Sequence, residues 1–173
     1  MNPSVPLSPE QIDIAAPRSD ADWADAARLL TDYAEWLHYV SGYQDTEIVQ
    51  EIEANPALLR SRYVTPNGAF VLARFAGNAV GIAAVKRMSC EIAEIKRVYL
   101  RPSARGLGLA QQLLETAIDA ARRLRVKRLR LETHEEYMPA AVKLYTRRGF
   151  YEIPAYSDLA DFVSGVKAME LEL

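Results

Sequence analysis

The chain has 173 residues, half of them hydrophobic, with a formal net charge of −2 and a single cysteine. No apolar run approaches the roughly 20 residues that a membrane-spanning helix needs, and no charged-then-apolar leader precedes the first element. The small net charge argues against general nucleic-acid binding, and one cysteine excludes an internal disulfide framework. We therefore expect a soluble cytoplasmic protein with one domain over residues 11–173, after a loose, proline-containing tail over residues 1–10.

The hydrophobic periodicity predicts strands and helices that alternate along the chain. Asp20 or Asp22 is expected to cap the first helix, Pro56 to end the second, and Gly77 to lie in a hairpin turn. The predicted elements are a strand over 11–17, a helix from 20 or 22 to 39, a helix over 45–55, strands over 69–75, 80–86 and 92–100, a helix over 110–124, a strand over 128–132, a helix over 139–148, and strands over 151–153 and 168–173.

A glycine-containing loop lies between the strand over 92–100 and the helix that follows it. Gly106 and Gly108 lack a Cβ, so the backbone can approach an anion closely, and the first N–H groups of the helix have no acceptor within it. Arg105 adds a positive charge beside the loop. The loop lacks the Gly-Lys-Ser/Thr ending of an ATP-binding loop and the third glycine of a dinucleotide fingerprint, so the pattern favours neither ATP nor NAD. For the tetrapeptide on its own, an ordinary glycine turn before a helix is the favoured interpretation.

The segment over 105–110, Arg-Gly-Leu-Gly-Leu-Ala, is similar to the Arg/Gln-x-x-Gly-x-Gly/Ala acyl-CoA loop of the GNAT superfamily of N-acyltransferases. The segment over 140–150 resembles the family's Ala-x-x-Leu-Tyr-x-x-x-Gly-Phe signature, and the segment over 94–100 resembles a strand of bacterial members. The resemblance is specific over residues 69–153, while the first third of the chain matches only in its order of elements. It implies an α/β fold, the GNAT fold, with a splayed mixed sheet of about seven strands flanked by about four helices.

The resemblance implies acetyl-CoA as the acetyl donor, and the sequence has no cluster with metal-ligand spacing. In the family the sheet opens between its fourth and fifth strands, and the pantetheine arm of the donor lies in that opening. The backbone of the fourth strand, at Val98 and Leu100, would bind this arm. The residues that would hold the rest of the donor are Arg105, Gly106, Leu107, Gly108, Leu109 and Ala110, the last four through N–H groups directed at the pyrophosphate, and Tyr145 at the sulfur.

The implied reaction is direct attack of a neutral amine on the acetyl thioester in a ternary complex. An alkyl amine has a pKa of about 10 and must lose a proton first, usually to a carboxylate. Glu94 is the first candidate for this base, with a salt bridge to Lys96 on the same strand face as an equal alternative, and Glu132 is the second candidate. The resemblance assigns the backbone N–H of Val98 to the oxyanion and the Tyr145 hydroxyl to the departing thiolate, with core packing as the alternative for Tyr145.

Other reactive side chains have weaker support. Cys90 has no histidine near it in sequence and is expected to be an inert thiol. His38 is expected on a helix surface, and His134 in a loop after the fifth strand, with a proton relay as its alternative. The basic run over 122–130 spans a helix end, a turn and a strand, so its charges should point in different directions, with contact to the 3′-phosphate of CoA left open.

The acceptor is predicted only as a class: a primary amine of a small molecule, an amino acid or a peptide. In the family, the first two helices and the link between the last two strands wall the acceptor side. The matching residues are Trp36, Tyr39, Tyr43, Gln44, Tyr156, Ser157 and Asp158. A non-catalytic acyl-CoA-binding or sensor domain is the alternative function, because the glycine loop serves binding in either case. Family members often form homodimers, and a homodimer is expected on that ground alone.

Overall fold

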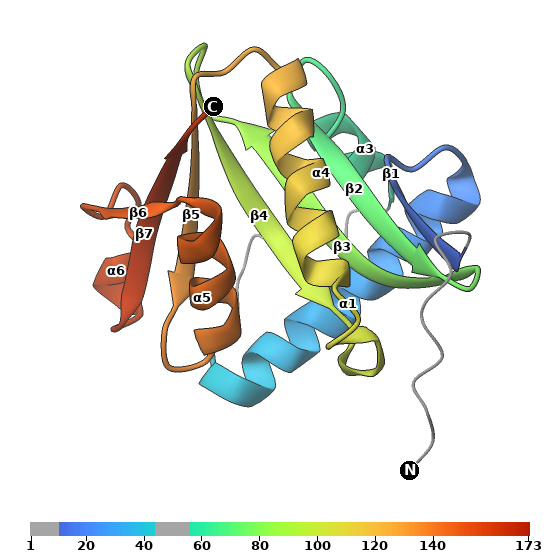
Figure 1. The fold of residues 1–173 in the computed structure, drawn as a ribbon, viewed down its shortest axis with the longest axis horizontal. Coiled ribbons are helices and arrows are strands. Elements are labelled where there is room, and N and C mark those ends of the chain that lie inside the picture. The colour runs from blue at the N-terminus through green and yellow to red at the C-terminus, as the bar shows by residue number, and fades with distance from the viewer. Residues whose placement is uncertain (1–10, 44–55) are drawn as a thin grey trace.

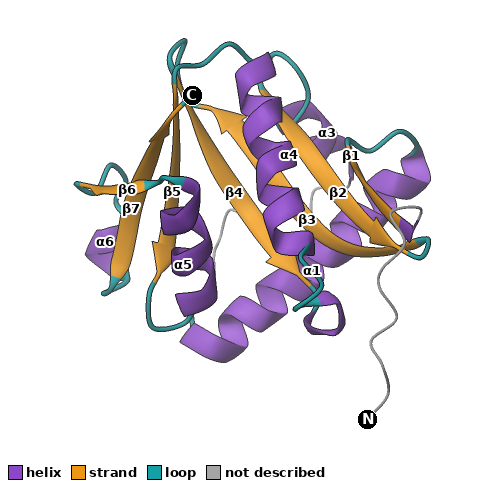
Figure 2. Ribbon diagram, in the orientation of Figure 1, coloured by secondary structure: helices purple, strands orange, loops and turns teal. Residues whose placement is uncertain are grey.

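The computed structural model describes residues 11–43 and 56–173. Within them, seven strands form one mixed sheet in the order β1-β2-β3-β4-β5-β7-β6, as Figure 1 and Figure 2 show. The strands are β1 (Ile12–Ala15), β2 (Gly68–Phe75), β3 (Asn78–Arg87), β4 (Ile92–Leu100), β5 (Arg128–His134), β6 (Tyr151–Ile153) and β7 (Val166–Glu172). The helices are α1 (Asp20–Ser41), α3 (Pro56–Arg62), α4 (Leu109–Arg123), α5 (Pro139–Arg148) and α6 (Leu159–Phe162), with a 3₁₀ turn at Pro102–Ala104. Neighbouring strands are antiparallel except β4 and β5, and the predicted α/β class is confirmed.

Helix α1 is capped by a residue that the sequence analysis did not select. The N-cap is Ser19 and not Asp20 or Asp22: the Asp22 N–H donates to the Ser19 Oγ at 3.1 Å, and the Ser19 N–H donates to the Asp22 carboxylate at 3.0 Å. This capping box provides acceptors for two N–H groups that the helix leaves open, and it places Asp22 at the third helical position. At the other end Gly42, with a φ of 67°, donates its N–H to the His38 carbonyl and ends the helix.

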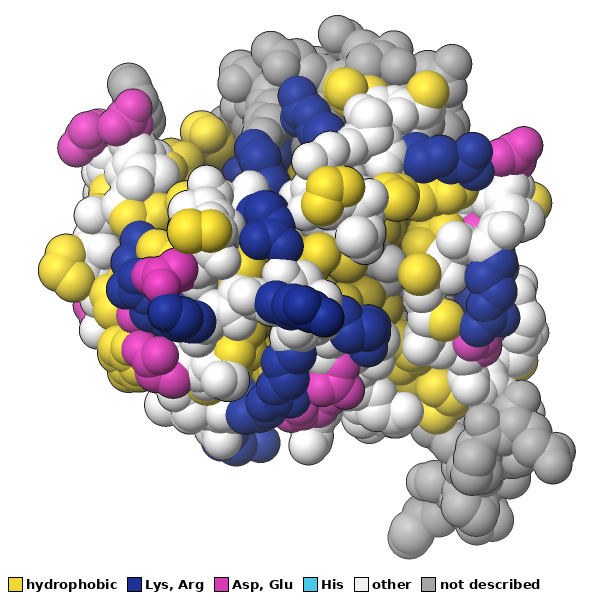
Figure 3. All heavy atoms as spheres, turned by 90° about the horizontal axis from the view of Figure 1, so that it is seen from above, with side chains coloured by type: hydrophobic (Ala, Val, Ile, Leu, Met, Phe, Trp, Pro, Cys, Tyr) yellow, Lys and Arg dark blue, Asp and Glu magenta, His cyan; other side chains and the backbone are white. Residues whose placement is uncertain are grey.

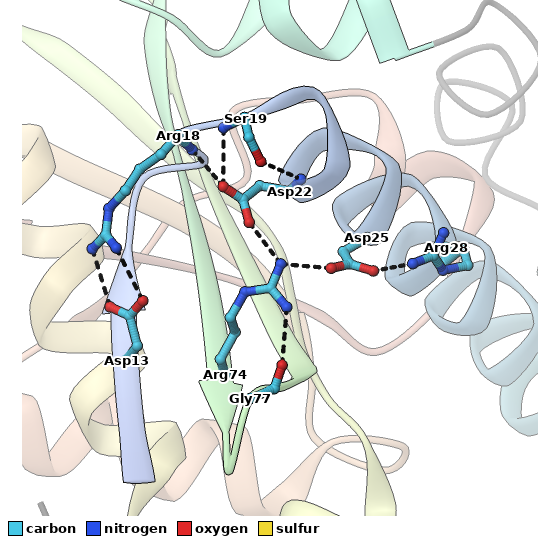
Figure 4. Close-up of polar contacts among 8 residues, drawn as sticks. All are labelled: Asp13, Arg18, Ser19, Asp22, Asp25, Arg28, Arg74 and Gly77. Carbon is cyan, nitrogen blue, oxygen red and sulfur yellow. Dashed lines mark hydrogen bonds and ion pairs between the residues drawn. The ribbon is translucent and has the colours of Figure 1, made fainter. Parts of the chain in front are cut away.

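An arginine on β2 ties the first turns of α1 to the sheet (Figure 4). The Nη2 atom of Arg74 donates to a carboxylate oxygen of Asp22 at 2.6 Å and of Asp25 at 2.5 Å, and its Nη1 donates to the Gly77 carbonyl. The backbone N–H of Arg18 and the Arg74 guanidinium lower the pKa of Asp22 to about 2. The start of α1 is therefore held against the β2–β3 hairpin by charge as well as by packing.

The sheet separates two hydrophobic layers. In Figure 1, α4 and α5 lie in front of the sheet and α1 and α3 lie behind it. The layer under α4 includes Val71, Val85, Ala93, Ile95, Leu113, Leu114, Ala117, Ile118, Leu129 and Leu131. The layer under α1 and α3 includes Trp23, Leu29, Leu30, Leu59, Tyr63, Phe70, Leu72 and Ile82. None of the helices in residues 11–43 and 56–173 has the length and hydrophobicity of a transmembrane segment.

The structure changes several predicted boundaries. Residues 1–10 and the helix predicted over 45–55 lie outside the described residues. Pro56, predicted to end a helix, is the first residue of α3, because proline has no N–H and the first helical turn needs none. β5 extends to His134 and β7 begins at Val166, since these two residues pair across the strands. The β6–β7 link, predicted without regular structure, contains the one-turn helix α6.

Candidate active site

The backbone of the loop between β4 and α4 is uncovered at its two glycines. Gly106 and Gly108 have φ angles of 79° and 74°, in the left-handed region that glycine adopts most readily. A Cβ built on either glycine meets no atom of the described residues within 4 Å. Gly108 is the N-cap of α4, and the first turn of that helix contains no acidic residue. The loop therefore presents N–H groups without helical acceptors, and the positive end of the helix dipole, to the space in front of it.

Arg105 lies between this loop and α1. Its Nε donates to the Leu100 carbonyl oxygen at 3.1 Å, and its guanidinium carbon lies 5.7 Å from the centre of the Trp36 ring. Trp36, predicted for the acceptor wall, also packs against the rings of Tyr33 and Tyr99. These contacts hold the charge of Arg105 beside the loop and place Trp36 next to it.

The strands β4 and β5 pair over only part of their length. The parallel ladder joins residues 92–95 to residues 128–131, whereas β4 continues to Leu100 and β5 to His134. Beyond the ladder the two strands diverge toward the bottom of Figure 1. The opening between the fourth and fifth strands that the family resemblance implies is therefore present.

A bulge in β4 decides which face of the sheet each of its side chains occupies. Arg97 has a φ of 59°, and the register with β3 shifts at the same place. Before the bulge, Ile95 belongs to the core under α4, so Glu94 lies on the face toward α1. After the bulge, Val98 and Leu100 belong to the core under α4. Regular alternation would have put Glu94, Val98 and Leu100 on one face, and the bulge separates them.

Where β4 and β5 separate, a cavity of about 120 Å³ opens on the α1 face of the sheet. Its volume is somewhat below that of engineered cavities of about 150 Å³ that hold benzene, so there is room for a small group. Its polar walls come mainly from β4 and β5 through Glu94, Lys96, Glu132 and His134. The other lining residues are Tyr33, Leu37, Ser41, Tyr43, Ile95, Arg97, Thr133, Tyr137, Met138, Leu159, Val163 and Val166.

Glu94 is buried in this cavity, and both of its carboxylate oxygens have partners. The Tyr156 hydroxyl donates to Oε1 at 2.9 Å, and the Lys96 Nζ lies 3.6 Å from Oε2. The salt bridge to Lys96, which was the alternative to a catalytic role, is therefore present. Burial, followed by the negative charges of Glu94 and Glu132, raises the pKa of Tyr156, so its phenol keeps its proton and donates.

Glu132 lies on the neighbouring strand and is half-buried. The hydroxyl of Ser157 donates to its Oε1 at 2.7 Å. Burial raises the pKa of Glu132 above its ordinary value and the charge of Glu94 adds to this, while the Ser157 bond and Lys96 act in the opposite direction. A carboxylate with a raised pKa is a better proton acceptor near neutral pH than an ordinary one. Tyr156 and Ser157, adjacent in the β6–β7 link, thus each hold one of the two carboxylates.

His134 is the last residue of β5, and the prediction of a loop histidine is wrong. The residue is 8% exposed and is one of the residues that line the cavity. The local sequence contains a signal for this, because polar residues at 130, 132 and 134 alternate with Leu129, Leu131 and Thr133 and extend the strand pattern beyond the predicted end at 132.

Tyr145 belongs to the core between α4, α5 and the sheet, which Val98 also joins. It is 5% exposed, and its ring centre lies 5.8 Å from that of Phe150. Burial raises the pKa of its hydroxyl well above the ordinary value, so the hydroxyl stays protonated. Among the described residues that line the cavity, Glu94 and Glu132 occur together and neither Tyr145 nor Val98 occurs. The structure therefore groups the two carboxylates, and separately groups Tyr145 with Val98.

Only some of the residues predicted for the acceptor side line the cavity. Tyr43 lines the cavity, whereas Tyr39 is 88% exposed on α1 and Asp158 is exposed before α6. Gln44 lies outside the described residues. The cavity is also lined by Tyr33 from α1 and Tyr137 from the β5–α5 loop. Neither residue was predicted for this site, because only the tertiary fold brings them there.

Two further reactive residues lie away from the cavity. Cys90 is an exposed thiol before β4, and His38 is exposed in the last turn of α1, as predicted for a surface histidine. Over residues 11–43 and 56–173, no group of three or more His, Cys, Asp or Glu side chains is arranged to hold a metal ion.

The basic run over 122–130 lies at the end of the molecule opposite the glycine loop. Figure 3 shows this end, where Lys and Arg side chains are interspersed with acidic and hydrophobic ones. Lys127 pairs with Glu91, and the Arg122 Nη1 lies 2.9 Å from a carboxylate oxygen of Asp119. The run begins in the last turn of α4, so the length of that helix, about 22 Å at 1.5 Å per residue, separates it from the loop.

The sequence matches the model of the acetyltransferase (GNAT) family over residues 23–150. The chain belongs to the acetyltransferase (GNAT) family. The match begins in α1 and includes β4, the glycine loop, β5 and α5. It therefore extends into the N-terminal part of the chain, where the sequence resemblance was limited to the order of elements, and it gives the enzyme class, an acyltransferase.

One relative supports this membership, and two solved structures share the fold. An uncharacterized N-acetyltransferase of Schizosaccharomyces pombe is 30% identical over 152 residues, which cover 87% of this chain and 89% of the relative. An acetyltransferase from Streptococcus agalactiae has a TM-score of 0.73 at 18% identity, covering 95% of this chain and 99% of that one. The PaiA N-acetyltransferase of Thermoplasma acidophilum, solved in complex with coenzyme A, has a TM-score of 0.68 at 19% identity, covering 94% and 99%. The two structures share the fold of this GNAT acetyltransferase.

Proposed function

We propose that this GNAT protein transfers the acetyl group of acetyl-CoA to a primary amine of a small molecule, an amino acid or a peptide, by direct attack in a ternary complex. One observation supports this most strongly: a cavity lined by two carboxylates opens where β4 separates from β5, and β4 then leads into the clear glycine loop. The loop suits the diphosphate of a CoA thioester, and the carboxylates suit an amine that must lose a proton before it attacks.

The loop residues fit the diphosphate of acetyl-CoA. The N–H groups of residues 107–110 lie at the start of α4, and charge-assisted hydrogen bonds of this kind contribute roughly 1.5–3 kcal/mol each. Arg105 and its contacts add a fixed positive charge beside them. The backbone of β4 beyond residue 95, including Val98 and Leu100, has no ladder with β5 and would bind the pantetheine arm. PaiA, which shares the fold, was solved with coenzyme A, and this supports the assignment.

The reaction needs a base, an oxyanion partner and an acid. The protonated amine first loses one proton and becomes the nucleophile. Its nitrogen then forms a bond to the acetyl carbon and loses a second proton, and the carbon–sulfur bond breaks; one proton is taken up by the sulfur and the other passes to solvent. In our proposal, a cavity carboxylate accepts the proton that leaves before attack, and the Tyr145 hydroxyl donates the proton to the sulfur. The N–H of Val98 binds the carbonyl oxygen as it becomes negative.

The contacts favour Glu132 over Glu94 as the base. Glu94 is engaged by Tyr156 at one oxygen and by Lys96 at the other, so both of its carboxylate oxygens already have partners within the protein. Glu132 has a pKa raised mainly by burial, which brings it closer to neutral pH. In this assignment Glu94 attracts the protonated amine into the cavity, and Glu132 removes its proton.

Release of the CoA thiol tests the function. The acceptors are a panel of amino acids, polyamines, aminoglycosides, aromatic amines and N-terminal peptides, with a blank that lacks an acceptor. We expect release above the blank with one acceptor class. Acetyl-CoA binding by calorimetry without release across the panel would support a non-catalytic acyl-CoA-binding domain instead. Absence of binding would contradict the proposal as a whole.

Two isosteric variants test the assignment of the base. Glu132→Gln should lower kcat by about 100-fold or more, as expected for loss of a general base, and leave acetyl-CoA affinity unchanged. Glu94→Gln should act mainly on the KM of the amine. If the two variants show the opposite split, Glu94 is the base.

A further inference from the structure

Three charged residues lie side by side across the sheet, on the face that also carries the cavity. Glu94 on β4 is the register partner of Arg130 on β5, and Arg130 is the register partner of Glu170 on β7. Their neighbours along each strand belong to the core under α4, so all three side chains lie on the α1 face. Neighbouring strands are about 4.8 Å apart, and the long arginine side chain spans the distance to either carboxylate.

Of these two carboxylates, Arg130 binds that of Glu170. The Nε of Arg130 lies 2.7 Å from Oε2 of Glu170, and the Tyr151 hydroxyl donates to Oε1 of the same carboxylate at 2.9 Å. Burial by itself would raise the pKa of Glu170, but the bonds from Arg130 and Tyr151 outweigh burial and hold this pKa below its ordinary value. Glu170 is therefore ionised at neutral pH, and its contact with Arg130 is an ion pair.

Tyr156 contacts both Arg130 and Glu94. The Arg130 guanidinium carbon lies 5.2 Å from the centre of the Tyr156 ring, and the Tyr156 hydroxyl donates to Oε1 of Glu94 at 2.9 Å. In the described part of the chain, Glu94 forms its ion pair with Lys96 at 3.6 Å, which is longer than an ordinary hydrogen bond. The Glu94 side chain lines the cavity and is 10% exposed, so a ligand can reach it.

A guanidinium bound to Glu94 would occupy the carboxylate that, in the proposed reaction, attracts a protonated amine, because arginine and carboxylate form strong two-bond pairs. We propose that Glu170 and Tyr156 are positioning residues for amine binding. Glu170 holds Arg130 away from Glu94, and the Tyr156 hydroxyl occupies the Glu94 oxygen that Arg130 would otherwise bind. The charge of Glu94 thus stays available to the amine. This inference rests on the proposed function, because it concerns the amine anchor of the same site.

Two single variants and one second substitution test this arrangement. Glu170→Gln keeps the shape of the side chain and removes the charge that holds the guanidinium. Tyr156→Phe keeps the ring against the guanidinium and removes the hydroxyl that occupies Glu94. Arg130→Met, added to either variant, removes the competing cation. Glu172→Gln is the matched control, because Glu172 is another acidic residue of β7 that contacts the Tyr151 hydroxyl, at 3.4 Å.

The probe is propylamine, titrated by calorimetry at neutral pH into protein saturated with CoA, so that no acetyl transfer occurs. An alkyl amine with a pKa of about 10 is protonated under these conditions. In Glu170→Gln and in Tyr156→Phe we expect the Kd of propylamine to rise about tenfold or more, as for loss of one charge-assisted hydrogen bond. Adding Arg130→Met to either variant should restore the wild-type Kd, and Glu172→Gln should leave it unchanged.

The restoration separates this proposal from a merely structural role, because Arg130→Met removes a further contact and would then weaken binding more. The inference is overturned if Arg130→Met does not restore the Kd. It is equally overturned if both single variants bind propylamine as the wild type does, including the case in which none of the proteins binds it. If Glu170→Gln does not fold, Tyr156→Phe with and without Arg130→Met decides the matter. If no amine of the panel releases thiol, the proposed function fails, and the titration still decides the inference because it needs no turnover.

Discussion

A methyl group at Gly106 separates the ligand-facing role of the glycine loop from its backbone strain. Gly106 and Gly77, which lies in the β2–β3 turn, have the same φ of 79°, and a Cβ at either position meets no described atom within 4 Å. The substitutions Gly106→Ala and Gly77→Ala therefore impose the same strain on the protein. Only Gly106→Ala puts the methyl group in front of the proposed diphosphate site, so Gly77→Ala is the matched control.

The two effects have different expected sizes. An L-residue in the left-handed region costs about 1–2 kcal/mol, and each kcal/mol lowers the Tm of a chain of this size by about 2–4 °C. Both variants should therefore melt about 2–8 °C below the wild type. At Gly106 the methyl group also moves the diphosphate away from the loop N–H groups. Loss of one charge-assisted hydrogen bond, about 1.5–3 kcal/mol, raises the Kd of acetyl-CoA roughly 10- to 150-fold.

Thermal melts and calorimetric titration with acetyl-CoA on the wild type and both variants measure these effects. We expect similar Tm values for the two variants and a weakened Kd for Gly106→Ala alone. If Gly106→Ala binds acetyl-CoA as tightly as Gly77→Ala, the loop is not the diphosphate site. A loss of affinity shared by both variants would point to general destabilisation and would equally refute the reasoning.

Three further predictions concern the acid, the base and the α1 anchor. Tyr145→Phe removes the proposed proton donor and keeps the ring packed on Phe150. We therefore expect kcat to fall about 100-fold or more while Tm and acetyl-CoA affinity stay constant, and an unchanged kcat would exclude Tyr145 as the acid. Ser157→Ala removes a bond that lowers the pKa of Glu132, so the acidic limb of the kcat/KM profile, where Glu132 becomes protonated, should move to higher pH; a limb that does not move would exclude Glu132 as the base. The folded-state pKa of Asp22 is lowered from 3.8 to about 2, so its contribution to stability is present above pH 3.8 and lost as the pH falls toward 2. The free energy of unfolding, measured with denaturant, should therefore fall less between pH 3.8 and pH 2 in Asp22→Asn than in the wild type. An equal fall in both proteins would contradict the stabilisation of α1 by the bonds of Asp22 to Arg18 and Arg74.

Local sequence signals predicted the helices and strands that depend on short-range physics. Helix α5 begins at Pro139 and ends at Gly149 as predicted, because the missing N–H of proline and the positive φ of glycine act within a few residues. The errors occurred where several local solutions were equally good. Ser19, Asp20 and Asp22 all suit a helix N-cap, and only the reciprocal bonds between Ser19 and Asp22 show which one is used. Pro56 suits the start of a helix as well as its end.

The polar residues of the candidate site were largely predicted, but their partners were not. Glu94 and Tyr156 are 62 residues apart in sequence, and Glu132 and Ser157 are 25 apart, so no periodicity connects them. The burial of His134 and its bond to Ser164 likewise depend on how β5 pairs with β7 and on the close approach of Gly165.

The sequence by itself determined the order of elements, the glycine loop at the start of α4 and the family motifs, because each of these depends on residues that are neighbours in the chain. The tertiary structure alone decided that β4 and β5 part after four paired residues and that the bulge at Arg97 turns Glu94 away from Val98 and Leu100. It also decided that Glu94, Glu132 and His134 face one cavity. The face that a strand residue occupies, and the side chains that it contacts there, depend on pairing with strands that are distant in the chain. A single bulge also reverses the alternation of side chains, and no sequence pattern predicts where it occurs.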